Sequence, residues 1–119
     1  MQIARSVMTD PELLLLDEPA AGLDLGGRED LVSTLSVLAQ DADSPATVLV
    51  SHHVEEIPPG FGHALLLREG RVVAAGLLDD VMTEHNLSET FGMPLVLQHT
   101  GGRWSARRRQ RRTAQPPIN

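Results

Sequence analysis

Two neighbouring carboxylates follow an apolar segment near the start of the sequence. In LLLLDEP (13–19), four leucines lead directly into Asp17 and Glu18. Because neighbouring residues in a strand point in opposite directions, one carboxylate can face a metal ion while the other faces a substrate. On this interpretation Asp17 holds Mg²⁺ through its water shell, and Glu18 orients and deprotonates an attacking water. The alternative is a buried strand that ends in a solvated turn.

Two later segments carry further polar residues at the expected boundaries of structural elements. AAGLD (20–24) ends in Asp24 just before an expected helix, where a helix cap is the simple alternative. In VLVSHHVEEI (48–57), an expected strand ends in Ser51 and His52. A single histidine is more often packed or solvated than catalytic, so His52 gains significance only in combination with the preceding segments.

The apolar patterns predict a strand–helix–strand unit that positions these residues. Residues 13–16 do not alternate, which predicts a strand buried on both faces of a parallel sheet. Residues 28–39 place leucines at helical spacing, and residues 47–51 (TVLVS) are β-branched and apolar. The order predicts a parallel crossover, with both strands ending at the sheet edge where ligands bind.

The remaining segments predict smaller elements. Residues 2–8 are compatible with the end of a helix. Residues 63–68 and 71–75 predict an antiparallel hairpin that turns at Glu69 and Gly70, and short helices are expected over 78–84 and 87–92.

Composition limits the chemistry and the location of the chain. No cysteine is present, and all ten basic residues are arginine, so cysteine chemistry and a phosphate-binding lysine are excluded. No run of about 18 apolar residues and no secretory signal is visible, so a cytoplasmic protein is expected. The net charge of −6 is uneven, because residues 103–119 hold six arginines and no acid. Residues 1–100 are therefore expected to form the domain, and 101–119 a disordered, arginine-rich tail.

The three polar segments, in this order and spacing, resemble those of the ABC ATPase family. LLLLDEP resembles its Walker B segment, AAGLD its D-loop and VSHH its switch-histidine segment. The flanks are similar as well: QIARSVMTDPELL resembles the stretch after the signature motif, and HALLLREGRVVAAG the hairpin after the switch histidine. The segment EEIPPGF resembles cassettes related to the molybdate type. The resemblance covers roughly residues 2–80.

This resemblance implies a role for each matching residue. Asp17 would be the Mg²⁺-associated aspartate and Glu18 the catalytic base. Asp24 would lie at the interface of a head-to-tail dimer and help to couple its two ATP sites. His52 would contact the γ-phosphate and the attacking water. His53 stands where many relatives carry an acid, and it is assigned no role.

The resemblance also implies a fold and partners. The expected fold is α/β of the P-loop NTPase type, mainly parallel, with a C-terminal antiparallel hairpin. The implied function is the binding and hydrolysis of ATP, with Mg²⁺ as cofactor, to energise transport through a membrane permease. The protein would be cytoplasmic and attached to the inner face of the membrane through that permease.

Three motifs of the family are missing from the sequence. The glycine-rich phosphate loop, the glutamine loop and the signature motif have no counterpart here. We therefore expect the sequence to begin part-way through the domain and the isolated chain to be inactive.

Three alternatives remain open at this stage. A histidine–carboxylate metal site is one, because histidines and glutamates cluster in sequence, namely His52, His53, Glu55, Glu56 and His63. An arginine-rich segment (103–112) that binds nucleic acid or anionic lipid is the second, against a merely solvating tail. The solvating tail is favoured and nucleic acid is not the expected partner, because Trp104 is the only interleaved aromatic residue. A non-transport ABC ATPase shares the same motifs and is the third.

Overall fold

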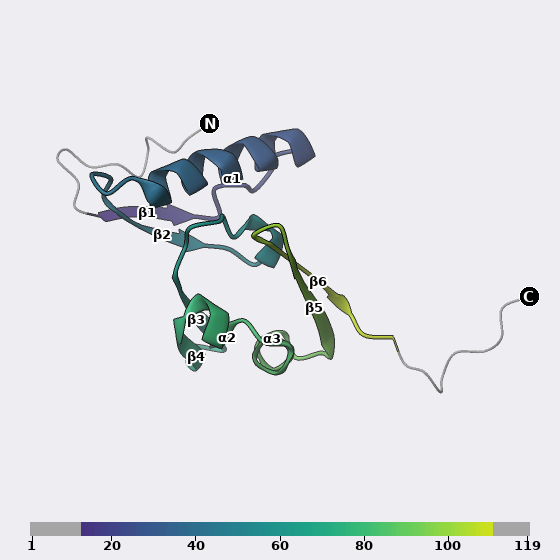
Figure 1. Ribbon diagram of the computed structural model, residues 1–119. Coiled ribbons are helices and arrows are strands. Elements are labelled where there is room, and N and C mark those ends of the chain that lie inside the picture. Colours follow the sequence, from purple (N-terminus) through teal and green to yellow (C-terminus); the bar gives the residue numbers. More distant parts are fainter. Residues whose placement is uncertain (1–12, 111–119) are drawn as a thin grey trace, which may run out of the picture. The chain divides into compact units, whose positions relative to one another are not determined.

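The computed structural model describes residues 13–110, which form two compact units (Figure 1). Unit 1 contains the chain up to Phe61 together with His99–Trp104. Unit 2 contains Gly62–Gln98 and the chain from Ser105 onward. The helix end expected over residues 2–8 lies outside the described residues.

Unit 1 is built on a strand–helix–strand arrangement. Strand β1 (Leu13–Asp17) leads through a turn to helix α1 (Leu25–Gln40), and strand β2 (Ala46–Val50) follows. The two strands pair in parallel, from Leu13 opposite Ala46 to Asp17 opposite Val50. The predicted strands, helix and parallel pairing are therefore confirmed, and both strands end at the same edge.

The core of unit 1 lies between α1 and one face of the two strands. Its buried members come from β1, the following turn and α1, and Leu38, Leu49 and Phe61 pack against them. The leucine stripe predicted for the helix faces this core, with Leu31 and Leu35 almost completely buried. Burial of each such leucine contributes about 1.5–3 kcal/mol to folding. No helix within residues 13–110 is both long and apolar enough to cross a membrane.

The opposite face of β1 is open, which corrects the expectation of a strand buried on both faces. Leu14 and Leu16 are buried, whereas Leu13 is 51% exposed and Leu15 49% exposed. Among the described residues of unit 1, helix α1 packs on a single face of the strand pair, so side chains alternate between core and surface along β1.

Unit 2 begins with the predicted antiparallel hairpin. Strand β3 (His63–Arg68) pairs with β4 (Arg71–Leu77), and a bulge lies between Leu66 and Leu67. Both turn residues have positive φ, 53° at Glu69 and 77° at Gly70. Two positive φ values are typical of the type I′ turn, whose twist matches that of the paired strands.

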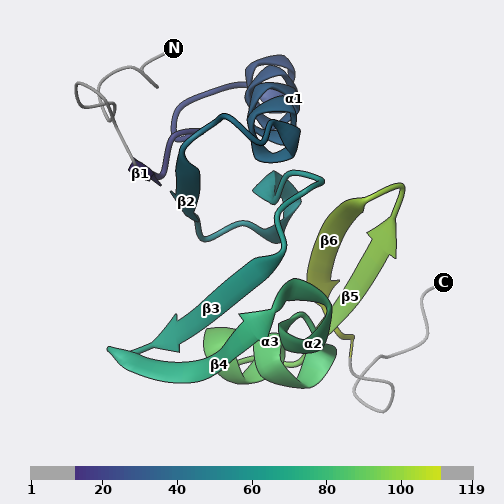
Figure 2. The same ribbon diagram turned by 60° about the vertical axis from the view of Figure 1, so that its left-hand side comes forward.

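Two short helices follow and contact this hairpin (Figure 2). Helix α2 (Leu78–Val81) and helix α3 (Glu84–Phe91) correspond to the helices predicted over 78–84 and 87–92. The Thr83 hydroxyl caps α3 by accepting a hydrogen bond from the Asn86 backbone N–H at 3.1 Å. Gly92, with a φ of 71°, ends the helix in the left-handed conformation.

A second hairpin lies in the segment expected to be disordered. Strand β5 (Leu95–Thr100) pairs with β6 (Arg103–Arg108) across Gly101 and Gly102, whose φ values are 60° and 77°. The expectation of disorder from residue 101 is therefore wrong for residues 101–108. The glycines permit a tight turn, and Trp104 is buried and stacks on His99 with ring centroids 3.7 Å apart. Residues 111–119 of the expected tail lie outside the described residues.

The fold is therefore mixed α/β, with a sheet arrangement that differs from the expected one. The described strands form three two-stranded sheets, of which β1–β2 is parallel and β3–β4 antiparallel. The expectation of a mainly parallel sheet is wrong for these residues, because a single crossover connects parallel strands and tight turns connect the others.

Within unit 1, Arg103 joins the tip of the β5–β6 hairpin to α1. Its guanidinium donates two hydrogen bonds to the Glu29 carboxylate, at 2.7 and 2.9 Å, and a third to the Glu55 carbonyl at 2.6 Å. The hydrogen bond from Arg103 holds the pKa of the Glu29 carboxyl below its ordinary value of 4.5. The forked geometry makes this a specific contact rather than a loose surface pair.

We predict that Glu29→Gln destabilises the chain in a pH-dependent way. Because the folded-state pKa of Glu29 is lowered, its stabilisation is present above the unfolded-state pKa and is lost as pH falls through the folded value. The side chain is 45% exposed, so we expect a loss of at most about 1 kcal/mol at pH 7. Melting curves of both proteins between neutral pH and about pH 3 measure the difference, which should shrink on acidification.

Asp30→Asn is the matched control, because Asp30 is the neighbouring exposed carboxylate and its side chain has no ion pair among the described residues. A loss at Glu29 that stays constant down to pH 3 would contradict the prediction.

Candidate functional site

The turn after β1 starts with a left-handed residue. Glu18 has a φ of 51°, and its backbone N–H donates to the Val50 carbonyl at 2.9 Å. Its own carbonyl accepts from the Ala21 N–H at 3.1 Å, which closes the turn. A non-glycine residue in this conformation costs about 1–3 kcal/mol and persists only where its surroundings hold it. The backbone therefore fixes where the Glu18 side chain leaves the sheet edge.

Glu18 and His52 contact each other at this edge. Glu18 Oε1 lies in hydrogen-bonding contact with His52 Nδ1, although the residues are 34 positions apart in sequence. A carboxylate only accepts hydrogen bonds, so Nδ1 is the donor in this contact. The side chains are 31% and 77% exposed, respectively, and both are accessible to solvent. The structure thus brings together two of the predicted site residues, and their catalytic roles stay a prediction.

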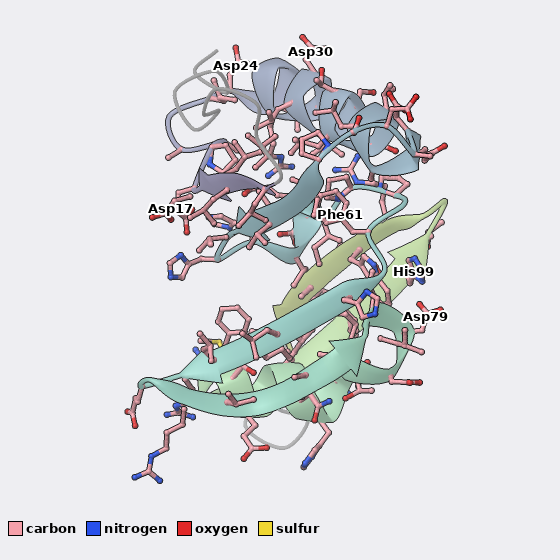
Figure 3. All side chains as sticks on the ribbon, turned by 90° about the vertical axis from the view of Figure 1, so that its left-hand side faces the viewer. Asp17, Asp24, Asp30, Phe61, Asp79 and His99 are labelled. Atoms are coloured by element: carbon pink, nitrogen blue, oxygen red, sulfur yellow. The ribbon has the colours of Figure 1, made fainter. Side chains whose placement is uncertain are left out.

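Asp17 is the last residue of β1 and stands directly beside this pair in sequence. Its side chain is exposed and projects from the edge of unit 1, as Figure 3 shows. Its carboxylate has no hydrogen-bond or ion-pair partner within residues 13–110. Carboxylate oxygens of this kind are suitable ligands for Mg²⁺, which typically takes one or two protein carboxylates and completes its shell with water and phosphate.

Asp24 caps helix α1. Its Oδ1 accepts a hydrogen bond from the Gly27 backbone N–H at 2.8 Å, at the start of the helix (Figure 3). Such a cap contributes about 1 kcal/mol to stability. The structure does not bring Asp24 into hydrogen-bonding contact with Glu18 or His52. A role for this exposed residue at a dimer interface stays a prediction.

Ser51 and Glu56, near His52, make a contact that the sequence analysis did not predict. The Ser51 hydroxyl donates to Glu56 Oε1 at 2.6 Å, and the His53 backbone N–H donates to Ser51 Oγ at 3.0 Å. Glu56 closes the 3₁₀ helix η2 (Val54–Glu56) and is buried. No sequence signal distinguishes Glu56 from the adjacent Glu55, because the contact depends on how this short turn folds.

The hypothesis of a histidine–carboxylate metal site gains no support from the geometry. Within residues 13–110, no group of three or more histidine, aspartate or glutamate side chains could hold a metal ion. His52 is in contact with Glu18, and Glu56 accepts from Ser51. Two of the five proposed ligands therefore have separate partners.

The arginine-rich segment is partly engaged within the fold. Arg103 pairs with Glu29, and Arg109 pairs with Glu84 at 2.7 Å. Trp104 is buried, so its ring is not displayed for stacking on bases. Binding of nucleic acid or anionic lipid by this segment stays untested.

Several proteins of known family are similar to this chain. It is 45% identical over 93 residues to an uncharacterized ABC transporter ATP-binding protein, YlmA, of Bacillus subtilis. The matched residues cover 78% of this chain and 35% of the relative. It is 42% identical over 89 residues to YmeB of Lactococcus lactis, another such protein, covering 75% and 34% of the two chains. The molybdenum import ATP-binding protein ModC 1 of Azotobacter vinelandii is 40% identical over 89 residues, covering 75% of this chain and 24% of the relative.

The structural comparison agrees with the sequence comparison. A solved structure of an ABC transporter in an inward-facing conformation superposes with a TM-score of 0.64 at 24% identity, covering 87% of this chain and 42% of that one. No family model matches the sequence. The chain is thus a homologue of ABC transporter ATP-binding proteins and spans about a third of the length of YlmA and of YmeB.

We predict that two substitutions at Glu18 separate the effect of its left-handed backbone on stability from the effect of its carboxylate. Glu18→Ala and Glu18→Gly both remove the contact with His52, but only glycine also removes the Cβ that disfavours the left-handed conformation. We expect the glycine variant to be more stable than the alanine variant by about 1 kcal/mol, as measured by denaturant unfolding. An alanine variant at least as stable as the glycine variant would contradict the prediction.

Proposed function

We propose that this homologue of ABC transporter ATP-binding proteins supplies the residues that act on water and on the terminal phosphate during ATP hydrolysis that energises membrane transport. The contact between Glu18 Oε1 and His52 Nδ1 carries the proposal. It places a carboxylate and an imidazole, both solvent-accessible, at the carboxyl edge of a parallel strand pair. Ligands bind at such edges in α/β folds.

Glu18 is the proposed general base. Its carboxylate can accept a proton from water at Oε1 or Oε2, and its partial exposure admits that water. The imidazole of His52 holds the carboxylate through Nδ1–H, and its imidazolium form, which carries a second N–H, also presents Nε2–H to a phosphoryl oxygen. A hydrogen-bond donor aimed at the charge that develops on a transferring phosphoryl group stabilises the transition state.

Asp17 is the proposed Mg²⁺-associated residue. Its exposed carboxylate has no partner among the described residues and fits a metal that keeps most of its ligands from water and phosphate. When bound, Mg²⁺ neutralises charge on the phosphates. Asp24, exposed at the start of α1, is the proposed contact with a second ATPase subunit in a head-to-tail dimer.

The partners proposed for the working protein follow from its relatives. Their names describe ATP-binding proteins of ABC transporters, and one group serves molybdenum import. We propose that this chain likewise works with a membrane permease. The elements that cradle the phosphates would come from residues other than those described, because this sequence contains neither a lysine nor a glycine-rich phosphate loop.

A chimera tests the proposed roles. We replace the matching segment of Azotobacter vinelandii ModC 1 with this chain and measure ATP hydrolysis, with unaltered ModC 1 as reference. Glu18→Gln keeps the size of the side chain but removes the base, so we expect kcat to fall by about 10²–10⁴-fold while Mg-ATP binding is retained. His52→Ala should lower kcat by about 10²–10³-fold, because it removes a donor to developing charge.

The control variant in this experiment is Glu69→Gln, which makes the same chemical change at the exposed turn of the β3–β4 hairpin and should leave hydrolysis unchanged. Hydrolysis by the Glu18→Gln chimera at the unaltered rate would refute the role of Glu18. A folded chimera without activity beside active ModC 1 would refute the proposed function of the chain.

We further predict that the chain by itself binds Mg-ATP weakly or not at all. Most of the affinity for a nucleotide triphosphate comes from backbone N–H groups of the phosphate loop and its lysine, and this sequence has neither. Isothermal titration calorimetry of the chain with Mg-ATP measures this directly, with ModC 1 titrated in parallel. Binding in the micromolar range by the chain alone contradicts the prediction.

A further inference from the structure

Glu56 is the one charged side chain buried within residues 13–110, at 7% exposure. A buried carboxylate is costly unless hydrogen bonds compensate for the water that it loses. The proposed hydrolysis uses Glu18, Asp17 and His52 and leaves Glu56 without a role. The position of Glu56 four residues after His52, in the turn that follows the same strand, suggests where that role lies.

The hydrogen bonds near Glu56 involve Ser51 and His53, the residues on either side of His52. Ser51 Oγ lies 2.6 Å from Glu56 Oε1, a length typical of a hydroxyl that donates to an ionised carboxylate. A serine hydroxyl has one hydrogen and can accept through its lone pairs. With that hydrogen directed at Glu56, the Ser51 oxygen accepts from the His53 backbone N–H at 3.0 Å. The residues on both sides of His52 are therefore tied to one hydroxyl.

The anchor for this arrangement is the short helix η2. The Glu56 backbone N–H donates to the His53 carbonyl at 3.1 Å, and Val54 is buried. Glu56 thus links the turn to Ser51 through its side chain and to His53 through its backbone. These bonds close a small ring of contacts through residues 51, 53 and 56.

His52 depends on such support, because its own side chain is poorly packed. The imidazole is 77% exposed, so neighbouring side chains restrict its rotation very little. An exposed side chain loses rotamer freedom when it is held in one contact, and that entropy must be opposed by other interactions. A fixed backbone at residues 51–53 reduces the number of directions in which the imidazole can point.

We propose that Ser51 and Glu56 are positioning residues that hold the backbone of His52 so that Nδ1 meets the carboxylate of Glu18. The hydroxyl of Ser51 transmits the constraint, and the buried carboxylate of Glu56 fixes that hydroxyl. The catalytic meaning of this arrangement rests on the proposed function, whereas the positioning of His52 can be measured on the chain itself.

The test uses NMR spectroscopy of the isotope-labelled chain. The readouts are the ¹⁵N signal of His52 Nδ1 and the nuclear Overhauser contact between the His52 ring and the Glu18 side chain. Ser51→Ala removes the hydroxyl, and we expect the Overhauser contact to be lost and the Nδ1 signal to move toward that of a free imidazole. Ser51→Thr retains the hydroxyl, and we expect it to preserve both signals.

A second variant tests the other end of the pair. Glu56→Met keeps the length of the side chain but offers no strong acceptor, so it should affect the His52 signals as Ser51→Ala does. Ser36→Ala is the matched control, because it removes a part-buried hydroxyl that donates to the Pro59 carbonyl at 2.8 Å and leaves residues 51–56 unchanged. This control should lower stability without altering the His52 signals.

Wild-type His52 signals in folded Ser51→Ala or folded Glu56→Met would overturn the proposal, as would the same loss in Ser36→Ala. In the ModC 1 chimera, Ser51→Ala should lower kcat by about 10–100-fold with KM nearly unchanged, and Ser51→Thr should restore it. If the chimera is inactive but the NMR signals change as expected, the proposed function fails while the positioning of His52 stands.

Discussion

The parallel pairing of β1 with β2 is the constraint on which the candidate site depends. It aligns Asp17 with Val50, so the residues that follow the two strands emerge at one edge. Glu18 then binds back to Val50 through its N–H, and His52 follows two positions after Val50. A contact between side chains 34 positions apart therefore requires that this register be kept. A slip of a single residue would turn every side chain of β1 to the opposite face.

The leucines of β1 do not set that register by themselves. Residues 13–16 are all leucine, so a strand turned over by one position would present two leucines to the core just as the observed one does. The difference lies at Asp17, which shares the exposed face with Leu13 and Leu15. Turning the strand over would direct Asp17 into the core under α1, where an unpaired carboxylate costs several kcal/mol. The residue proposed to associate with the metal thus also specifies which face of β1 is buried.

The sequence predicted the parts of the fold that depend on local pattern. Two examples are helix α1, which follows from its leucine spacing, and the β3–β4 hairpin, which follows from its Glu69–Gly70 turn. Each depends on the residues of a single segment. The meeting of Glu18 and His52 was predictable because both residues follow parallel strands. The β5–β6 hairpin was missed because a high arginine content obscured the Gly101–Gly102 turn. The one-sided burial of β1 was missed because an unbroken leucine run carries no information about which face is covered.

The Ser51–Glu56 contact could not be predicted from sequence, because it depends on how the short turn after β2 folds. It belongs to a site in which locally unfavourable features are held by hydrogen bonds. Two features of the site oppose folding locally: the left-handed backbone of Glu18 and the burial of the Glu56 carboxylate. Each is offset by a hydrogen bond, from the Glu18 N–H to Val50 between the two strand ends and from Ser51 to Glu56 within the segment after β2. A register slip between β1 and β2 would leave the cost at Glu18 uncompensated. The bond from the Glu18 N–H to Val50 requires the observed register and also fixes where the Glu18 carboxylate leaves the sheet edge, so the geometry of the site and the specificity of the strand pairing have a common physical origin.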